Sequence, residues 1–427
     1  RSSFSLNLLY LIFTSAILFC SLFYLYFALN INEYAATIKK YSEPAVDSDF
    51  YLSEYITPKY ENIVFPEDKK NLIVILMESM ESSFSDKESG GVLDKNLIPH
   101  LTKIADENVN FSGTQKLGGG IDLSGTGWTI AGMTAKFAGL PYNIRGAENQ
   151  NSPFFLPAAV TLTDILSNAG YRQRFIFGSD KHFASRDSLL ETHGNVEIHD
   201  IAWYKAHGML PESYNVFWGF EDSKLFDFAK YELSDLASLS EPFMLGLLTV
   251  DTHMPTGYQC KLCPETEDMP LKNTILCADN LVYDFLEWCK TQTWYEQTVI
   301  VLMGDHLFMA TQDTNPFGDD SYLTAHRLKS ELGGMDGNPR RWLDIFINAD
   351  FHAEKLQTKN RKFSSFDMFP TILASLGCEI SGNRLGFGVN LFSDEKTLTE
   401  RFSEEYINEN LMKRNRQYEN LELFSIK

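Results

Sequence analysis

The sequence predicts an α/β fold in which helices cover both faces of a mainly parallel sheet. Short apolar runs are typical of buried strands, and helical patterns such as those at residues 158–169 and 274–291 lie between them. Such alternation favours βα units and therefore a parallel sheet. The runs that predict strands are Leu72–Met77, Arg174–Phe177, Phe243–Val250, Thr298–Met303 and Trp342–Ile347.

The regions that flank this pattern predict a membrane anchor and a tail. Phe4 to Leu29 is an uncharged apolar run of 26 residues, longer than the roughly 20 that span a bilayer and than the apolar core of a signal peptide. We expect a transmembrane helix at 1–29, a juxtamembrane linker with short helices at 30–68, a catalytic domain at 69–395 and a small helical C-terminal subdomain at 396–427. The chain starts at Arg1 rather than Met, which leaves open whether further transmembrane helices precede it.

The charge of the chain limits its partners. The formal net charge of −20 argues against a nucleic-acid-binding protein. If the substrate is an anion, the site must supply positive charge of its own, from arginine, lysine or a bound cation. Residues 311–340 are polar and rich in Gly, Asn and Asp, which predicts a long loop or lid.

The cysteines allow more than one interpretation. Cys260 and Cys263, with Cys277 following, could form a zinc site, a redox motif or a disulfide. The polar, proline-containing surroundings favour a disulfide, which would place this region on the oxidising side of a membrane. The pairing stays open among Cys260, Cys263, Cys277, Cys289 and Cys378.

A glycine-containing loop leads into a predicted helix at residues 124–133. Gly125 and Gly127 permit a tight turn, and Thr129 would lie where the loop becomes the helix. Free backbone N–H groups and the positive end of a helix dipole meet at that position, so a hydroxyl there could face a phosphate as a nucleophile. The alternative is that Thr129 only caps the helix.

Polar residues also follow four of the predicted strands, where ligands collect in α/β sheets. A single acid or histidine after a strand could be an ordinary surface residue, but four strands that end in this way indicate a site. The residues concerned are Glu78 and Ser79 after the first strand, Asp180, Lys181, His182 and Arg186 after the second, Asp251, Thr252 and His253 after the third, and Asp305 and His306 after the fourth.

A divalent cation fits part of this set. Glu78, Asp305 and His306 offer two carboxylates and one imidazole, and the Thr129 oxygen completes four ligands. These donors suit Mn²⁺ or Mg²⁺, with Zn²⁺ possible. Such a cation would hold Thr129 as an alkoxide and offset the charge that builds up on a phosphoryl group.

With these motifs in place, the chain resembles the phosphoglycerol transferases of the lipoteichoic acid synthase family, within the alkaline phosphatase and sulfatase-like superfamily. The most similar branch is phosphoglycerol transferase I, which decorates periplasmic glucans. The resemblance covers roughly residues 70 to 395, and its motifs are Leu76–Ser79, Gly125–Met133, Asp251–His253, Gly304–His306, Asp367–Thr371 and Gly386–Phe392.

The resemblance implies a role for several residues. Glu78, Asp305 and His306 match metal ligands, and Thr129 matches the nucleophile. His253 matches a histidine that contacts the phosphoglycerol group, where it could protonate a leaving group, activate the acceptor or only bind the headgroup. Arg186 matches a phosphate-binding arginine, and we expect Trp128, Asp180 and His182 to contact the substrate as well.

The chain also departs from the family pattern. Lipoteichoic acid synthases usually have Lys before the nucleophile, whereas Trp128 stands here, as in the glucan branch. That branch tends to read Thr-His-His-Pro-Asp, and here Met254 and Thr256 replace the second His and the Asp. The identity of the acceptor is therefore open.

The sequence thus predicts a metal-dependent phosphoglycerol transferase, with Mn²⁺ favoured, on the periplasmic or outer side of a bacterial inner membrane. It would move glycerophosphate from phosphatidylglycerol, through a threonine-bound intermediate, to a glucan or another envelope glycan. The alternatives are a phosphoethanolamine transferase, a sulfatase or phosphodiesterase of the same superfamily, and a catalytically inactive envelope-binding protein.

Overall fold

The computed structural model describes residues 46–143, 155–309, 340–351 and 356–422, with 13–15, 21, 328, 331 and 332. Its strands are β1 (Ile63–Val64), β2 (Asn71–Met77), β3 (Gly119–Gly120), β4 (Arg172–Phe177), β5 (Glu197–His199), β6 (Phe243–Leu248), β7 (Thr298–Gly304), β8 (Trp342–Ile347), β9 (Glu379–Ile380), β10 (Arg384–Leu385) and β11 (Gly388–Val389). Its α-helices are α3 (Asp49–Glu54), α4 (Pro99–Glu107), α5 (Thr129–Ala138), α6 (Leu162–Asn168), α7 (Arg186–Thr192), α8 (Ile201–Ala206), α9 (Asp222–Leu236), α10 (Pro270–Lys290), α12 (Met368–Ser375), α13 (Leu398–Arg401), α14 (Glu404–Leu411) and α15 (Arg416–Leu421).

The central sheet has the strand order β3-β8-β7-β2-β6-β4-β5. The five strands from β7 to β5 are parallel, whereas β8 pairs antiparallel with β7 and β3 pairs antiparallel with β8. All five predicted strands are present, and the prediction of a mainly parallel sheet is confirmed. The two short edge strands β3 and β5 were not predicted from the sequence.

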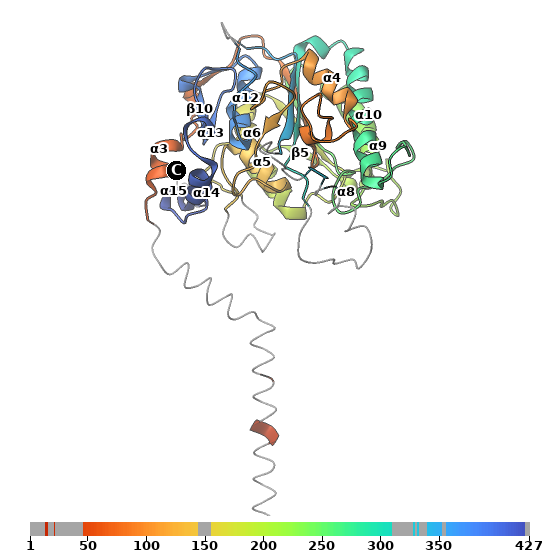
Figure 1. Ribbon diagram of the computed structural model, residues 1–427, viewed down its shortest axis with the longest axis horizontal. Coiled ribbons are helices and arrows are strands. Elements are labelled where there is room, and N and C mark those ends of the chain that lie inside the picture. Colours follow the sequence, from red (N-terminus) through yellow and green to blue (C-terminus); the bar gives the residue numbers. More distant parts are fainter. Residues whose placement is uncertain are drawn as a thin grey trace, which may run out of the picture. The chain divides into compact units, whose positions relative to one another are not determined.

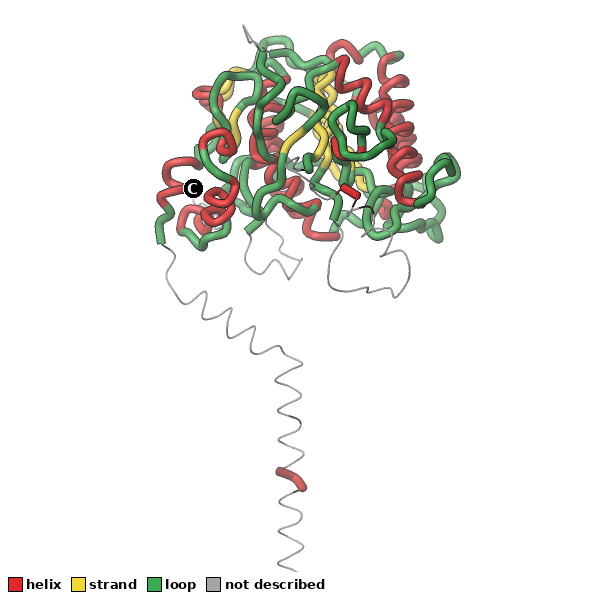
Figure 2. The backbone as a smooth tube through the Cα atoms, viewed as in Figure 1, coloured by secondary structure: helices red, strands yellow, loops and turns green. Residues whose placement is uncertain are grey.

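Helices cover the two faces of this sheet. Helices α5, α6 and α12 lie on one face, and α4, α9 and α10 lie on the other (Figure 1). The side chains of β2 alternate accordingly, with Leu72, Val74 and Leu76 in the first core and Ile73, Ile75 and Met77 in the second. The strands lie between the two helical layers, and loops connect the elements at both ends of the strands (Figure 2). Because both faces are covered, every β2 side chain from Leu72 onward is buried, as a parallel sheet requires.

The ends of the helices follow local sequence signals. Thr161 and Asp164 form a capping box at the start of α6, and Pro270 begins α10. A proline is tolerated in the first turn because its missing N–H has no partner there in any case. The predicted helices at 158–169 and 274–291 are therefore confirmed with shifted starts, at Leu162 and Pro270.

Part of the predicted linker belongs to the compact unit that begins at Ser48. Phe50 of α3 is buried and stacks on Phe387, and β1 pairs with β9 through Ile63 and Ile380. Apolar side chains at these positions explain the packing, because they bury surface that a solvated linker would leave exposed. The predicted C-terminal subdomain consists of the short helices α13 to α15 as far as it is described.

Three predicted features lie outside the described residues for the most part. They are the transmembrane helix at 1–29, the first part of the linker at 30–45, and the lid at 311–340. Among the residues that the structure describes, no helix is both long and apolar enough to cross a bilayer.

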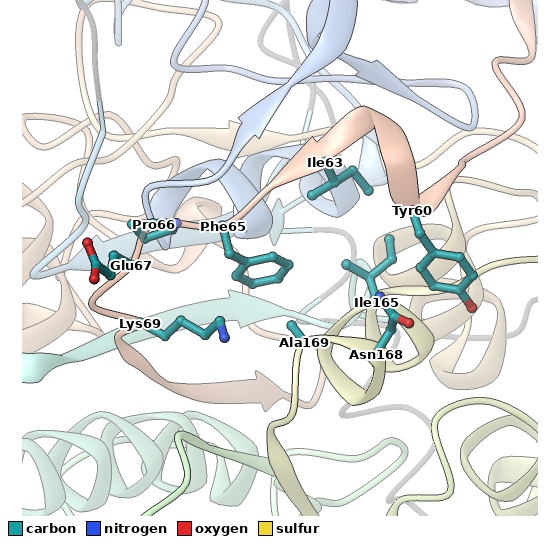
Figure 3. Close-up of a pocket in the computed structure, with 9 residues that line it drawn as sticks. All are labelled: Tyr60, Ile63, Phe65, Pro66, Glu67, Lys69, Ile165, Asn168 and Ala169. Atoms are coloured by element: carbon teal, nitrogen blue, oxygen red, sulfur yellow. The ribbon is translucent and has the colours of Figure 1, made fainter.

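A pocket of about 450 Å³ lies at the amino ends of β2 and β4. Residues between Tyr60 and Lys69 line one part of it, and Ile165, Asn168 and Ala169 of α6 line the other (Figure 3). The predicted site residues follow the carboxyl ends of the strands instead. This pocket is therefore not part of the candidate site.

Candidate active site

The two carboxylates of the predicted cluster come together because their strands are neighbours. β2 and β7 are adjacent and parallel, with Met77 opposite Gly304, so Glu78 and Asp305 leave the sheet side by side. His306 follows, and its Nε2 lies 3.6 Å from Glu78 Oε1 and 3.3 Å from Asp305 Oδ2. All three side chains are buried. The predicted cluster of Glu78, Asp305 and His306 is therefore assembled by the sheet.

Thr129 is the first residue of α5 and points into this cluster. Its Oγ1 lies 3.4 Å from Glu78 Oε2 and 3.5 Å from His306 Nε2. Trp128, not Thr129, occupies the cap position of the helix, in an extended conformation. The alternative that Thr129 only caps the helix is therefore wrong. Its hydroxyl lies at the positive end of the helix dipole, beside the Glu78 carboxylate and the His306 ring.

The tautomer of His306 leaves one nitrogen available as a ligand. His306 Nδ1 lies 2.8 Å from the Leu307 carbonyl oxygen, which can only accept a hydrogen bond. Nδ1 therefore donates, and Nε2 of the neutral ring keeps its lone pair toward Glu78, Asp305 and Thr129. Burial alone would lower the pKa of His306, but the Asp305 and Glu78 carboxylates outweigh burial and raise it.

The donor set fits a divalent cation. Donor atoms of Glu78, Asp305 and His306 all lie within 4.8 Å of one another. Asp305 Oδ2 is buried and has no hydrogen-bond partner among the described residues, although such an atom is costly to bury alone. Burial and then the Glu78 charge raise the pKa of Asp305 to about 7. A cation among these atoms would satisfy the oxygen and the excess negative charge, and this group could bind a metal ion.

Ser79 and Lys136 support the cluster from outside. Ser79 donates from its hydroxyl to Glu78 Oε1 (2.7 Å) and from its N–H to Asp305 Oδ1 (2.8 Å). Its φ of 53° is left-handed and uncommon for serine, which marks stored strain next to the site. Lys136 is completely buried, and its Nζ donates to the Asp305 carbonyl at 2.7 Å. This role of Lys136 could not be predicted from the sequence, because a single lysine in an apolar helix gives no signal of the group it contacts.

His253 borders the cluster through the segment that follows β6. The Thr252 hydroxyl donates to the Glu78 carbonyl at 2.6 Å, which places this segment against Glu78. His253 is half-buried, and its Nδ1 donates to the Met254 carbonyl at 2.7 Å, so Nε2 carries the lone pair of the neutral ring. Burial alone would raise the pKa of Glu78, but the charges of His253 and His306, with the hydrogen bond from Ser79, outweigh burial and lower it.

Asp251 forms a buried carboxyl pair with Asp222, the first residue of α9. The Asp222 carboxylate accepts from the N–H groups of Val250 (2.7 Å) and Asp251 (3.2 Å), and Asp251 accepts in return from the Asp222 N–H (3.1 Å). These reciprocal bonds hold the His253 segment in place. Burial, reinforced by the Asp222 charge, raises the pKa of Asp251 to about 10.

Arg186 supplies a buried positive charge near the cluster. Its Nη2 donates to Ser179 Oγ at 2.9 Å, and its guanidinium lies 4.6 Å from the centre of the Phe177 ring. Burial lowers the pKa of Arg186 to about 10, although Asp180 and Glu78 counter this effect. Arg186 is charged at neutral pH and sits at the carboxyl end of β4.

The remaining predicted contacts lie at the surface. Asp180 accepts from the His182 N–H at 2.9 Å, and His182 pairs with Asp187 at 2.5 Å. Trp128 is 38% exposed, and its ring lies 5.4 Å from that of Tyr142. The described contacts of Trp128, Asp180 and His182 are thus with neighbouring segments. The cluster itself consists of the buried Glu78, Asp305 and His306 and the half-buried Thr129.

The cysteine prediction is resolved in favour of a disulfide. Cys263 and Cys277 are bridged, with a Cα–Cα distance of 4.7 Å. Cys260 Sγ lies 3.6 Å from Cys263 Sγ and 3.7 Å from Cys277 Sγ, whereas Cys289 and Cys378 are buried free thiols. The bridge ties the segment after His253 to α10.

The chain is similar to known proteins in sequence and in fold. Residues 70–378 match the family model described as Sulfatase. The chain belongs to the sulfatase family. It is also 30% identical over 353 residues to phosphoglycerol transferase I from Xanthomonas campestris, an alignment that covers 80% of this chain and 45% of that protein. The chain thus spans about half the length of the curated relatives it matches.

Two solved structures share the fold. An alkaline phosphatase superfamily protein from Vibrio parahaemolyticus has a TM-score of 0.55 at 20% identity, covering 79% of this chain and 72% of that one. Lipoteichoic acid synthase LtaP from Listeria monocytogenes has a TM-score of 0.54 at 16% identity, covering 78% of each chain. The fold of this sulfatase-family chain is therefore alkaline phosphatase-like, as the resemblance implied.

Proposed function

We propose that this sulfatase-family chain is the catalytic part of a metal-dependent phosphoglycerol transferase. The observation that carries the proposal is the position of the Thr129 hydroxyl, 3.4 Å from Glu78 and 3.5 Å from His306 at the start of α5. The similarity to phosphoglycerol transferase I supports the choice of donor. The donor is phosphatidylglycerol, and the acceptor is a glucan or another envelope glycan.

The reaction has two displacements at phosphorus. First, Thr129 Oγ1 bonds to the phosphorus of phosphatidylglycerol, the bond to the diacylglycerol oxygen breaks, and diacylglycerol leaves with a proton. A glycerophosphoryl-threonine results. Second, an acceptor hydroxyl attacks the same phosphorus, its proton leaves, and the bond to Thr129 breaks. Covalent catalysis of this kind replaces one difficult step with two easier ones.

Two residues of this chain handle charge and protons in these steps. Arg186, a buried cation at the end of β4, binds a non-bridging phosphoryl oxygen. His253 keeps a free Nε2 because Nδ1 donates to the Met254 carbonyl. In the protonated ring, that nitrogen gives its proton to the leaving diacylglycerol oxygen, and the neutral ring then takes the proton of the acceptor hydroxyl. Thr129 enters the first step and leaves the second as its alkoxide, so the proton on His253 is restored after each turnover. Trp128, Asp180 and His182 contact the substrate from the rim of the site.

Glu78, Asp305 and His306, together with the Thr129 oxygen, would hold the metal ion, for which Mn²⁺ is our first choice over Mg²⁺ and Zn²⁺. A bound cation lowers the pKa of the hydroxyl and offsets negative charge on the phosphoryl group. The observation that favours a cation here is the buried Oδ2 of Asp305, which has no hydrogen-bond partner among the described residues.

The cellular location is part of the proposal. The apolar run Phe4 to Leu29 would anchor the chain in the inner membrane, and the Cys263–Cys277 disulfide favours an oxidising compartment, the periplasm or the outside of the cell. An anchor of this kind keeps the site close to lipid headgroups, where the donor is found.

An assay of headgroup transfer tests the proposed function. The full chain is incubated with Mn²⁺ and vesicles that contain phosphatidylglycerol or phosphatidylethanolamine, each labelled in its headgroup, and with candidate glycans. We expect release of diacylglycerol and labelled glycan from phosphatidylglycerol alone. Transfer from phosphatidylethanolamine alone would contradict the proposed donor, and release from neither lipid would contradict the proposed reaction.

A further inference from the structure

Two exposed aromatic side chains lie beside His253, and the proposed steps do not use them. Phe183 is 45% exposed and Trp218 is 42% exposed. Their ring centres are 5.6 Å apart, and the ring planes are inclined by 52°. Single exposed aromatic residues are common, but two that contact each other at the edge of a site call for an explanation. We refer to them as the Phe183–Trp218 pair.

The Phe183–Trp218 pair connects two residues of the proposed site. The Trp218 ring lies 5.1 Å from the His253 ring, centre to centre. The Phe183 ring centre lies 5.4 Å from the Arg186 guanidinium. A molecule that rests on the pair therefore lies next to both the phosphate-binding arginine and the histidine that activates the acceptor.

Both aromatic side chains are presented by unfavourable backbone conformations. Trp218 lies in a tight turn in which Val216 and Gly219 exchange two backbone hydrogen bonds of 2.8 Å. Phe217 in this turn has a φ of 50°, and Ala184 and Ser185, which follow Phe183, have φ values of 58° and 60°. Non-glycine residues rarely adopt such angles, and they persist mainly where function requires them.

The pair is also fixed before any ligand arrives. Gly219 forms a β-bridge with Ser179, and the Phe220 N–H donates to the Gly178 carbonyl at 2.9 Å, so the Trp218 turn is anchored at the end of β4. The Phe217 ring stacks on Tyr258 at 6.1 Å. A preformed surface loses little entropy on binding, which favours affinity.

We propose that the Phe183–Trp218 pair is an acceptor subsite that stacks against one sugar ring of the glycan. The proposal rests on the proposed function, since it assigns the acceptor of the same site. One face of a pyranose ring carries mainly C–H groups and packs against aromatic rings, whereas its rim carries hydroxyls. Exposed Asp180 and His182 lie within three residues before Phe183 and can hydrogen-bond to those hydroxyls.

The charges near the pair favour a neutral sugar over a membrane surface. An anionic membrane attracts clusters of Lys and Arg. The exposed or half-buried acids near Phe183 are Asp180 and Asp187. Of the cations there, Arg186 is buried and Lys181 is paired with Glu191 at 2.6 Å, so neither forms an exposed basic cluster. The formal net charge of −20 adds to the repulsion. A neutral glycan meets no such penalty.

Kinetics of acceptor use test the proposal. Full-chain Phe183→Ala and Trp218→Ala are assayed with phosphatidylglycerol vesicles and a linear glucose oligosaccharide, and formation of the glycerophosphoryl adduct is followed separately by intact mass. We expect KM for the oligosaccharide to rise about tenfold, equivalent to about 1.4 kcal/mol, with a much smaller change in the rate of adduct formation. Trp218→Tyr should recover most of the affinity.

The control is Tyr231→Ala, since Tyr231 is 55% exposed on α9 and belongs to no part of the site. An unchanged oligosaccharide KM in both alanine variants would overturn the proposal, as would weaker vesicle binding with unchanged KM, which would indicate a membrane contact. If the native chain forms no adduct, the proposed function fails instead. Calorimetry of the oligosaccharide with native chain and Trp218→Ala then still tests the pair, and equal affinities would overturn it.

Discussion

At the scale of single residues, the site brings buried acidic and basic side chains close together. Glu78 and Asp305 bring two carboxylates into a space from which water is excluded, and Lys136 brings one ammonium group to the Asp305 backbone. Burial lowers the pKa of Lys136 to about 8, although Asp122 and Asp305 oppose this effect. One lysine does not neutralise two carboxylates, and the proposed cation would supply the missing positive charge.

The Asp222–Asp251 pair predicts a pH dependence of stability. Burial raises the pKa of Asp222 to about 7, and burial and Asp222 together raise that of Asp251 to about 10, both from 3.8. The folded state therefore holds protons that the unfolded state loses above about pH 4, so the stability present at low pH falls as the pH rises toward those values. Asp251→Asn should remove the part of this pH dependence that comes from Asp251. The free energy of unfolding of the variant, relative to that of the native chain, should increase by up to about 1.4 kcal/mol per pH unit above pH 4.

Urea unfolding of both proteins between pH 5 and pH 9 measures this difference. Asp227→Asn serves as the control, because the Asp227 side chain is 75% exposed and should give a difference that does not change with pH. A constant difference for Asp251→Asn as well would show that the buried pair does not titrate as described.

Some of these residues could be predicted from the sequence and others could not. Glu78, Asp305 and His306 each follow an apolar run, so their positions at one edge of the sheet were predictable from the strand pattern. The pairing of Asp251 with Asp222 could not be predicted, because Asp222 starts a helix 29 residues away and no local pattern connects the two. Phe183 and Trp218 meet only through tertiary contacts of two irregular turns.

At the scale of elements, α5 carries the proposed nucleophile and must approach β7 closely. A Cβ atom on Gly132 would lie 2.2 Å from the Asp305 carbonyl oxygen and 3.5 Å from that of Thr126. Only glycine allows the first turn of the helix to lie this close to the Asp305 backbone at the carboxyl end of β7. The distance from Thr129 to the cluster depends on that contact.

Gly132→Ala should therefore weaken the site. We expect a net loss of roughly 1–3 kcal/mol in the free energy of unfolding from overpacking, partly offset by the better helix propensity of alanine, and a lower affinity for Mn²⁺. Thermal unfolding and metal titration measure the two effects. Gly127→Ala is a matched control, since its Cβ would meet only Asp122 Oδ2 at 3.7 Å. A Gly132→Ala chain with native stability and native metal affinity would contradict this account of α5.

Long elements could be predicted from the sequence, whereas very short ones could not. The five long strands were found because each is a continuous apolar run, but β3 consists of two glycines and β5 of three residues with mixed polarity. β3 exists because Gly119 and Gly120 let the chain lie against Trp342, where a Cβ on Gly119 would be 1.7 Å from the Trp342 oxygen. The strand β3 therefore depends on a tertiary contact and leaves no periodic hydrophobic pattern from which it could be predicted.

At the scale of the whole molecule, an acidic protein is proposed to act on an anionic lipid. The formal net charge is −20, so the cation and Arg186 must provide the local attraction. Metal binding should then stabilise the folded chain, because the ligands come from β2, α5 and β7 and are brought together only by folding.

Mn²⁺ added to the metal-free full chain at about 100 times its Kd should stabilise it by about 2.7 kcal/mol. Tm should rise by several degrees, as measured by scanning calorimetry. Asp305→Asn should lose most of this shift and the transferase activity, whereas Asp94→Asn, whose side chain is 92% exposed, should keep both. An equal metal-dependent shift in Asp305→Asn would show that the ligand set is wrongly assigned.

The most direct test of the central claim is the intact mass of the full chain after incubation with Mn²⁺ and phosphatidylglycerol, without an acceptor. The account predicts one added glycerophosphoryl group, mapped by peptide analysis to Thr129. Thr129→Ser keeps a hydroxyl at the start of α5 and should still form the adduct, and Thr129→Ala should bind metal but form none. An adduct on another residue, or transfer of headgroups by Thr129→Ala, would contradict the account.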